Sequence, residues 1–537
     1  MNTDPLEATS TEQPPGTVLG ILRRLGPGLI IAGSIVGSGE LIATTKTGAQ
    51  AGFWLLWLII IGCVIKVFVQ VEFGRYAISS GKATMAALDE VPGPRLVGNW
   101  LVWYWLVMFV VSLAQLGGIA GGVGQSMATS FPITGDFRRL LDRQNEWDAR
   151  ATEILDRMPE SETRPLAGRD PQVRRDARRR VWPQLVGRLG PRPGLKENPT
   201  WDDIYWASLM TLVTMVLLVV GRYALVQNVS TALVAAFTGI TIFCVFAVQQ
   251  TEYAFRWGDL ARGLEFRLPS WDVVTRSRLA LAKGEVTSPL VTALATFGII
   301  GVGATELIAY PYWCLEKGYA RFTGPRDETA EWGTRAQGWM RVMRWDALLS
   351  MVIYTFATVA FYVLGATVLH REGLDPEGTQ MIHALSRPYV HVFGEWALWL
   401  FLLGAFAVLY STFFVAIAGH ARVSADAAAV YGVAKRTSRA QFWWVRAFSV
   451  LLPLIALLFC VFIRHPVKLI LASGVMQAIM LPMLAAATLY FRYRRCDRRI
   501  APGKLWDVML WLSAFGLLVA GGAIAWMKLF PVLTQWW

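Results

Sequence analysis

The chain has 537 residues, of which 54% are apolar or aromatic and only 17% are charged. Soluble proteins carry about 25% charged residues, whereas here the apolar residues gather in blocks of about 20, the length of a helix that spans a bilayer. The composition excludes an ordinary soluble enzyme and predicts an all-helical polytopic membrane protein. The formal net charge is +13, but the basic residues lie between the apolar blocks and form no helical stripe, so we expect no nucleic-acid partner.

The chain begins with a polar, proline-containing segment, residues 1–19, which we expect to be a disordered cytoplasmic tail. Short loops on the side of this tail carry more Lys and Arg than the short loops on the other side. The positive-inside rule therefore predicts a cytoplasmic N-terminus in a plasma (inner) membrane, with the lipid bilayer as a partner. Eleven apolar blocks follow, starting near residues 27, 53, 99, 203, 226, 289, 346, 394, 444, 468 and 506.

A polar, arginine-rich segment, residues 131–200, interrupts this series after the third block. Its helical periodicity around Phe137–Met158 predicts a small helical insertion on the extracytoplasmic side. Two interpretations stay open: a solvated helical insertion, or a lid that binds a partner or gates the protein.

The first and sixth blocks contain a repeat. Gly37–Ala43 reads GSGELIA and Gly303–Ala309 reads GATELIA, with five identities in seven positions. An odd number of spans separates the two copies, so they enter the membrane from opposite sides. This pattern predicts inverted repeats over 20–250 and 251–495, followed by an eleventh helix in 496–537.

Transporters built from inverted repeats interrupt equivalent helices near mid-membrane, where free backbone groups meet the substrate. The glycines of the two motifs suit such a break, although they also suit close helix packing. An acidic side chain inside a bilayer needs a cavity, a cation or a basic partner. We therefore predict a hard divalent cation, with Glu40 and Glu306 as metal ligands. Further oxygens would come from Ser38, Thr305 and the carbonyls of an unwound backbone at Gly37 and Gly303. A structural role with Lys46, Lys66 or backbone N–H groups, or a shared proton, remains an alternative.

The chain also resembles a known family. The run from Gly26-Pro27-Gly28 through Gly48–Phe53, continued by Leu55-Leu56-Trp57, is similar to the first and second spans of the Nramp divalent-metal transporters. Phe297–Gly301 is similar to the entry to their sixth span. The resemblance implies a LeuT-like fold, in which two inverted five-helix repeats are followed by an eleventh transmembrane helix.

Three motifs of that family are altered here. Its metal-binding D-P-G-N falls on Gly37–Glu40, its M-P-H near Thr305–Leu307, and its D-x-x-E proton pathway on Ser112–Gln115. The resemblance therefore implies a divergent member that has lost the soft-metal ligand and the proton-pathway acids.

We expect a transporter, not an enzyme, that moves Mg²⁺ first and Mn²⁺ second by alternating access without proton coupling. No cofactor besides the transported cation is expected, and no protein partner can be inferred. The alternatives are a transporter of an organic cation or amino acid, and a non-transporting receptor or scaffold.

Overall fold

The computed structural model describes residues 11–167, 171–220, 223–269, 278–283 and 288–534. Over these ranges nine helices are long and apolar enough to cross a membrane, and a bent pair of helices adds a tenth span. The helix α12, which is not among these ten, corresponds to the fifth expected block. Each of the eleven expected spans therefore corresponds to a helix or to a broken or bent pair of helices. In chain order they are α2–η1–α3 (Pro27–Ile35, Val36–Thr44, Thr45–Ala51), α4–α5 (Leu56–Val64, Lys66–Ser80), α7 (Trp100–Ser130), α11 (Asp202–Val220), α12 (Tyr223–Ala247), α15–α16 (Pro289–Ile299, Ala304–Lys317), α18–η5 (Ala330–Leu364, Gly365–Leu369), α21 (Ala397–Val430), α22 (Ser438–Ile463), α23 (Pro466–Tyr490) and α24 (Lys504–Thr534).

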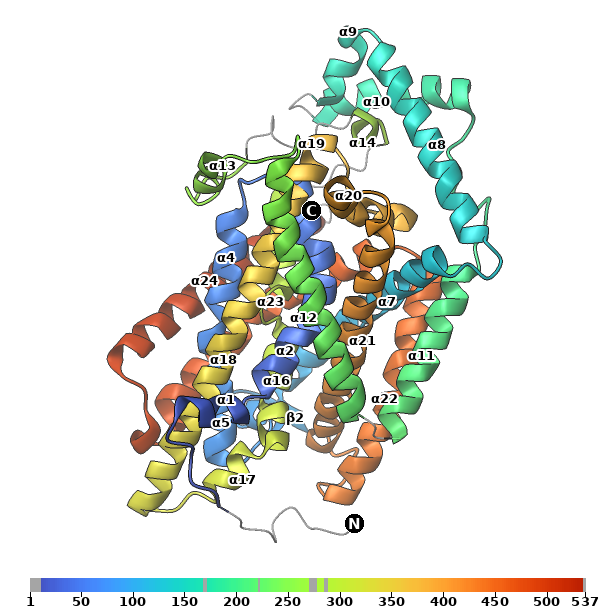
Figure 1. Ribbon diagram of the computed structural model, residues 1–537. Coiled ribbons are helices and arrows are strands. Elements are labelled where there is room, and N and C mark those ends of the chain that lie inside the picture. The colour runs from blue at the N-terminus through green and yellow to red at the C-terminus, as the bar shows by residue number, and fades with distance from the viewer. Residues whose placement is uncertain (1–10, 168–170, 221–222, 270–277, 284–287, 535–537) are drawn as a thin grey trace.

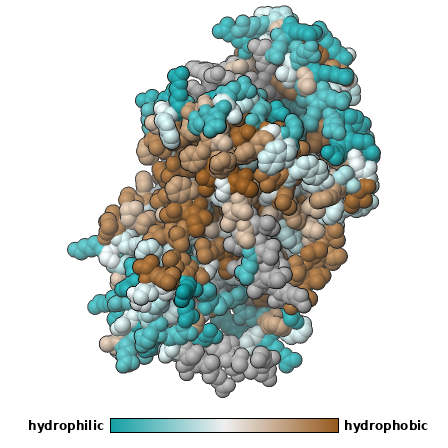
Figure 2. Space-filling view, viewed as in Figure 1, coloured by the Kyte–Doolittle hydropathy of each residue, from teal (hydrophilic) through white to brown (hydrophobic). Residues whose placement is uncertain are grey.

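The apolar and polar side chains on the surface are distributed as in a membrane-spanning protein. Apolar side chains cover the middle of the molecule and hydrophilic ones gather at its two ends (Figure 2). Large apolar side chains are exposed on the outer faces of α11, α22 and α24, for example Leu212, Leu458 and Phe515. Water would disfavour such exposure, whereas lipid favours it, so the chain is an integral membrane protein.

Short elements connect the spans. α1 (Val18–Arg24) and α17 (Tyr319–Thr323) lie at one end of the bundle, and α13 (Trp257–Arg262) and α20 (Met381–Phe393) lie at the other (Figure 1). The remaining pieces are α6 (Thr84–Asp89), the antiparallel pair β1 (Arg95–Leu96) and β2 (Gly98–Asn99), η3 (Val248–Gln250), α19 (His370–Glu372), η6 (Gly378–Gln380), η7 (Phe491–Arg495) and η8 (Arg498–Ile500).

The first span bends by 41° where α2 meets the π-helix η1, which contains the whole first motif. The hydroxyl of Thr44 donates to the carbonyl of Gly39, five residues earlier, at 3.0 Å. A π-helical turn widens the backbone without unwinding it and is frequent at functional sites. The expectation of unwound carbonyls around Gly37 was therefore wrong, because the backbone bends there and stays helical.

The sixth span has a true interruption. α15 ends at Ile299, α16 begins at Ala304, and the backbone between them is not helical. Gly301 has φ +58°, and a Cβ there would lie 2.9 Å from the Cα of Cys63. Both the dihedral angle and the close approach of α4 require glycine at this position.

Other motif glycines permit close packing of helices. A Cβ on Gly37 would lie 2.9 Å from the carbonyl oxygen of Val408 in α21. A Cβ on Gly298 would lie 2.7 Å from the nitrogen of Ala478 in α23 and would also collide with the carbonyl of Gly474. Both roles considered for these glycines are therefore present, at different positions.

The insertion forms a small helical unit at one end of the bundle (Figure 1). It consists of α8 (Asp136–Arg157), α9 (Glu160–Thr163), η2 (Arg164–Ala167) and α10 (Pro171–Leu189). These helices and α14 (Arg278–Lys283), from the connection between spans five and six, enclose a second apolar core that includes Trp147, Leu155 and Val181.

The N-terminal tail is not free over its whole expected length. Residues 1–10 lie outside the described residues. Glu12 forms an ion pair with Arg24 at 2.7 Å, and Trp339 of α18 donates to the Glu12 carbonyl at 3.0 Å. Glu12, in a segment that we expected to be disordered, therefore contacts the start of the seventh span.

Candidate ion-binding site

Glu40 lies in the middle of η1 and is completely buried. Its Oε1 accepts hydrogen bonds from the backbone N–H of Gly301 at 3.2 Å and from the hydroxyl of Thr358 in α18 at 3.1 Å. Its Oε2 is also buried and has no hydrogen-bond partner among the described residues. One carboxylate oxygen thus positions Glu40 against the break in span six, and the other is left unpaired.

Glu306 lies in the first turn of α16, on the other side of the break. Its Oε2 accepts a hydrogen bond from the hydroxyl of Thr305 at 2.9 Å. A Cβ on Gly303 would collide with this carboxylate, so the glycine makes room for Glu306 to fold back toward the break. The positive end of the helix dipole favours a carboxylate in this first turn.

The two carboxylates contact different parts of the same short break. Glu40 binds Gly301, whereas Glu306 lies beside Gly303 and Thr305. This arrangement brings the two copies of the repeat motif to one place in the bundle.

A chain of neutral polar side chains connects the two motifs through spans three and ten. Gln115 of α7 donates to Ser38 at 2.9 Å and accepts from Gln477 of α23 at 2.6 Å. Gln477 Oε1 in turn accepts from the Thr305 hydroxyl at 3.1 Å. The candidate residues Ser38 and Thr305 therefore meet through two glutamines that our site prediction did not include. The available signal was the presence of amides inside otherwise apolar spans.

A buried lysine lies behind the break. Lys66, the first residue of α5, is completely buried. Its ammonium group donates to the carbonyls of Phe297 and of Ile300, the latter at 2.8 Å. It also interacts electrostatically with Glu40 and Glu306, without an ion pair to either within the described residues. Lys66 is thus a neighbour of both acids, but its hydrogen bonds go to the backbone.

Lys46, the other lysine considered as a partner of Glu40, points elsewhere. Its ammonium group forms ion pairs with Asp375 at 2.5 Å and Glu377 at 2.8 Å. These acids lie in the connection between α19 and α20, so Lys46 ties the first span to that connection.

Oxygen atoms dominate the possible ligands at the break. No group of three or more His, Cys, Asp or Glu side chains that could hold a metal occurs in the part of the chain that the structure describes. A cation here would therefore need hydroxyl, amide or backbone oxygens, or water, besides a carboxylate. Oxygen ligands of this kind suit Mg²⁺ or Mn²⁺.

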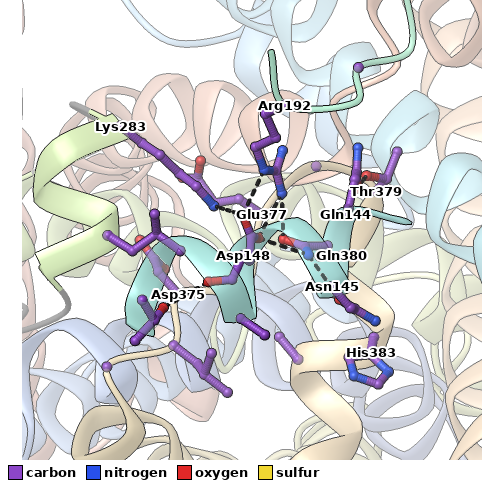
Figure 3. A pocket seen from close by; sticks show the side chains of 18 of the residues that line it. Gln144, Asn145, Asp148, Arg192, Lys283, Asp375, Glu377, Thr379, Gln380 and His383 are labelled. Atoms are coloured by element: carbon purple, nitrogen blue, oxygen red, sulfur yellow. Dashed lines mark hydrogen bonds and ion pairs between the residues drawn. The ribbon is translucent and has the colours of Figure 1, made fainter. Parts of the chain in front are cut away.

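The insertion adds a second polar region. A cavity of about 1060 Å³ lies between the insertion and the bundle, lined by Asp148 and Arg192 on one side and by Asp375 and Glu377 on the other. Figure 3 shows Asp148 as the centre of this contact. It binds Arg192 at 2.8 Å, Lys283 at 2.9 Å and Gln380 at 3.0 Å. Gln380 lies at the end of the connection whose Asp375 and Glu377 bind Lys46. The insertion is therefore attached to the first span through this connection.

We expect Asp148→Asn to loosen the insertion. Burial raises the pKa of Asp148, but Arg192 and Lys283 outweigh it and lower the pKa below its ordinary value. A lowered folded-state pKa means that the charge stabilises the fold above about pH 4 and that this contribution is lost as the pH falls through the folded-state value. Limited trypsin digestion of the purified protein should therefore cut within 131–200 faster in the variant.

The matched control is Asp142→Asn, an exposed position on the same helix. It should leave the cleavage rate unchanged. Equal rates for Asp148→Asn and the wild type would show that the insertion is held by its other contacts alone.

A bent first span and a broken sixth span that carry matching acidic motifs, in a bundle of two inverted repeats, are typical of the class of secondary transporters. The family model described as "Natural resistance-associated macrophage protein-like", Nramp, matches residues 199–527. The chain belongs to the Nramp family.

Two curated relatives match shorter segments. The "Divalent metal cation transporter MntH" of Bacillus subtilis (strain 168) is 30% identical over 105 residues, which is 19% of this chain and 24% of the relative. The "Metal transporter Nramp6.2" of Populus trichocarpa is 27% identical over 109 residues, 20% of this chain and 18% of the relative. The matched segments thus span a quarter or less of either relative.

Solved structures match over nearly the whole chain. A mutant of the Eremococcus coleocola manganese transporter superposes with a TM-score of 0.57 at 15% identity, covering 98% of this chain and 93% of that one. The same transporter in complex with an aromatic bis-isothiourea substituted compound gives 0.55 at 14% identity, covering 97% and 90%. At this identity the likeness concerns the fold, and the predicted LeuT-like fold is confirmed.

Proposed function

We propose that this Nramp-family protein transports a hard divalent cation, Mg²⁺ first and Mn²⁺ second, by alternating access around the break in span six. Glu40 and Glu306 are the charged ligands in this proposal, and Ser38 and Thr305 supply neutral oxygens. The similar proteins include a divalent metal cation transporter and a manganese transporter, which supports a divalent cation as the substrate.

The observation that carries the proposal is the unpaired oxygen of Glu40. A buried carboxylate oxygen without a partner costs about 1–3 kcal/mol or more, because burial removes its water and supplies nothing in return. Glu40 Oε2 lacks any partner in the described part of the chain, although Oε1 of the same group has two. A cation bound at Oε2 would relieve this cost.

The neighbouring groups support a hard ion. Ser38, Thr305 and Gln477 all present oxygen atoms along the hydrogen-bonded chain between the motifs. Mg²⁺ sheds its water reluctantly and is bound through one or two carboxylates with waters retained. One residue with a softer atom lies near: Cys63 is fully buried, and its backbone packs against Gly301.

The proposal that transport is not coupled to protons rests on two side chains of span three. Ser112 donates to the carbonyl of Met108 in its own helix at 2.9 Å, and Gln115 is bound within the neutral chain described above. Neither side chain titrates in the physiological range. A proton pathway through these two positions would therefore lack its acids.

Uptake by the wild-type protein in proteoliposomes tests the proposal. We expect saturable uptake of Mg²⁺ and Mn²⁺, with less competition from the softer Cd²⁺, and no acidification of the lumen reported by a trapped pH dye. Uptake of an amine with no divalent-cation flux would overturn the assignment. Preferred uptake of Cd²⁺ that is lost in Cys63→Ser would instead indicate a soft-metal site.

A further inference from the structure

Lys66 occupies an unusual position for a buried lysine. Lysine is rarely fully buried unless it is paired, because removing its charge from water is costly. Within the described residues no carboxylate lies at ion-pair distance from its ammonium group. Instead, Lys66 donates to the carbonyls of Phe297 and Ile300, at the point where α15 ends and span six breaks.

These carbonyls are the groups that an interrupted helix offers to a cation. The last carbonyls of a helix lack intrahelical donors and carry the negative end of its dipole. At half-helix ends of this kind transporters coordinate their ions. In this protein the ammonium group of Lys66 already binds these carbonyls.

The same Ile300–Gly301 peptide group is also held by the opposite charge. Glu40 accepts the N–H of Gly301, directly after the Ile300 carbonyl that Lys66 binds. Gly62 of α4 also packs against Phe297, where a Cβ would lie 2.8 Å from the ring, so α4 is pressed closely against the break. The break is thus fixed between a cationic and an anionic side chain.

We propose that Lys66 is a resident positive charge of the ion site, one that determines how tightly the site holds its cation. This inference rests on the proposed function. Lys66 withholds the carbonyls of Phe297 and Ile300 from the transported ion and offsets one of the two negative charges at the break. The ion therefore binds more weakly, keeps part of its water shell and is released readily. Lys66 acts here through charge and does not touch the ion.

Two substitutions distinguish an effect of the Lys66 charge from a structural role of its side chain. Lys66→Gln keeps a hydrogen-bond donor near the carbonyls but removes the charge, and Lys66→Arg keeps the charge. Mn²⁺ binding is measured by isothermal titration calorimetry on the purified wild-type and variant proteins. We expect Lys66→Gln to bind Mn²⁺ at least about tenfold more tightly, because a fixed positive charge beside the site repels a divalent ion strongly at low dielectric. Lys66→Arg should bind as the wild type does.

Transport provides a second readout. Lys66→Gln should show a lower KM for Mn²⁺ together with slower uptake at saturation, because release becomes slower. A residue with a purely structural role would not produce this split. Gln70→Leu, at a fully buried position one turn further along α5, is the matched control and should leave KM unchanged.

The outcomes are distinct. Mn²⁺ affinity unchanged in Lys66→Gln, or altered equally in Lys66→Gln and Lys66→Arg, overturns the inference. If Lys66→Gln loses its cooperative thermal transition while Lys66→Arg keeps it, the charge of Lys66 is needed to hold the break together, its role is structural, and the inference is overturned. Loss of folding in both variants overturns it. Absence of Mg²⁺ and Mn²⁺ binding in the wild type overturns the proposed function itself.

Discussion

Glu40→Gln should reduce divalent-cation uptake in proteoliposomes at least about a hundredfold while leaving the protein folded. Glutamine has the same shape as glutamate, and its amide oxygen can still accept from Gly301 and Thr358, which bind Oε1 in the wild type. The substitution removes the charge and replaces one oxygen by a donor. Loss of one member of a buried charged pair costs about 3–5 kcal/mol, which corresponds to more than a hundredfold in binding. Flux measured with a Mn²⁺-quenched dye, alongside the thermal unfolding midpoint, checks both parts.

Glu306→Gln should abolish uptake in the same way. Glu316→Gln is the control, because Glu316 lies on the same helix, is exposed and binds Arg422 at the surface. It should retain wild-type flux. Wild-type-like uptake by both Glu40→Gln and Glu306→Gln would remove the carboxylates from the ion pathway and leave them with a structural role at the break.

The repeat could be recognised without coordinates because its signal is local. An intramembrane glutamate is costly, so two of them in matching heptapeptides mark a shared structural position. The structure places the first glutamate against the peptide of Gly301 and the second beside Gly303, at the same break. The eleven spans were equally accessible, because they depend only on the length of the apolar blocks.

The partners of the two motifs were not accessible in the same way. Lys66 is 26 residues from Glu40 and more than 230 from Ile300, and only the packing of α5 against the break brings its ammonium group to that carbonyl. Gln115 and Gln477 meet across 362 residues. The sequence shows that each is polar within an apolar span, but this property fits helix packing and ion pathways equally well.

The bend in the first span is a second feature that the sequence alone could not predict. Gly37, Ser38 and Gly39 predict a weak helix, because glycine lowers helix stability by about 1 kcal/mol relative to alanine. A helix of low stability can either unwind or bend through a π-helical turn. The backbone N–H of Gly37 bonds the Thr412 hydroxyl at 3.1 Å, and this contact with α21 accompanies the bend. Such a choice depends on tertiary contacts and not on propensity.

Gly298→Val should prevent the formation of a stable folded protein. A Cβ at this position would collide with the carbonyl oxygen of Gly474 and lie 2.7 Å from the backbone nitrogen of Ala478. Gly474 is equally constrained, since its own Cβ would collide with the carbonyl of Ala295. Backbone atoms on both helices cannot move aside as a flexible side chain can, so α15 and α23 would have to separate. Overpacking of ordinary cores costs about 1–3 kcal/mol, and we expect at least the upper end here.

The measurement is the monodisperse fraction in size-exclusion chromatography of the detergent-solubilised protein, which should fall to a small fraction of the wild-type value. Gly239→Val is the matched control, because Gly239 lies on the exposed face of α12 and a Cβ there would meet no atom within 4 Å. It should behave as the wild type does. A stable, monodisperse Gly298→Val protein would mean that α15 and α23 are not in contact through Gly298. Because α15 leads directly into the break whose carbonyls Lys66 binds, the geometry of the ion site would then need to be redrawn as well.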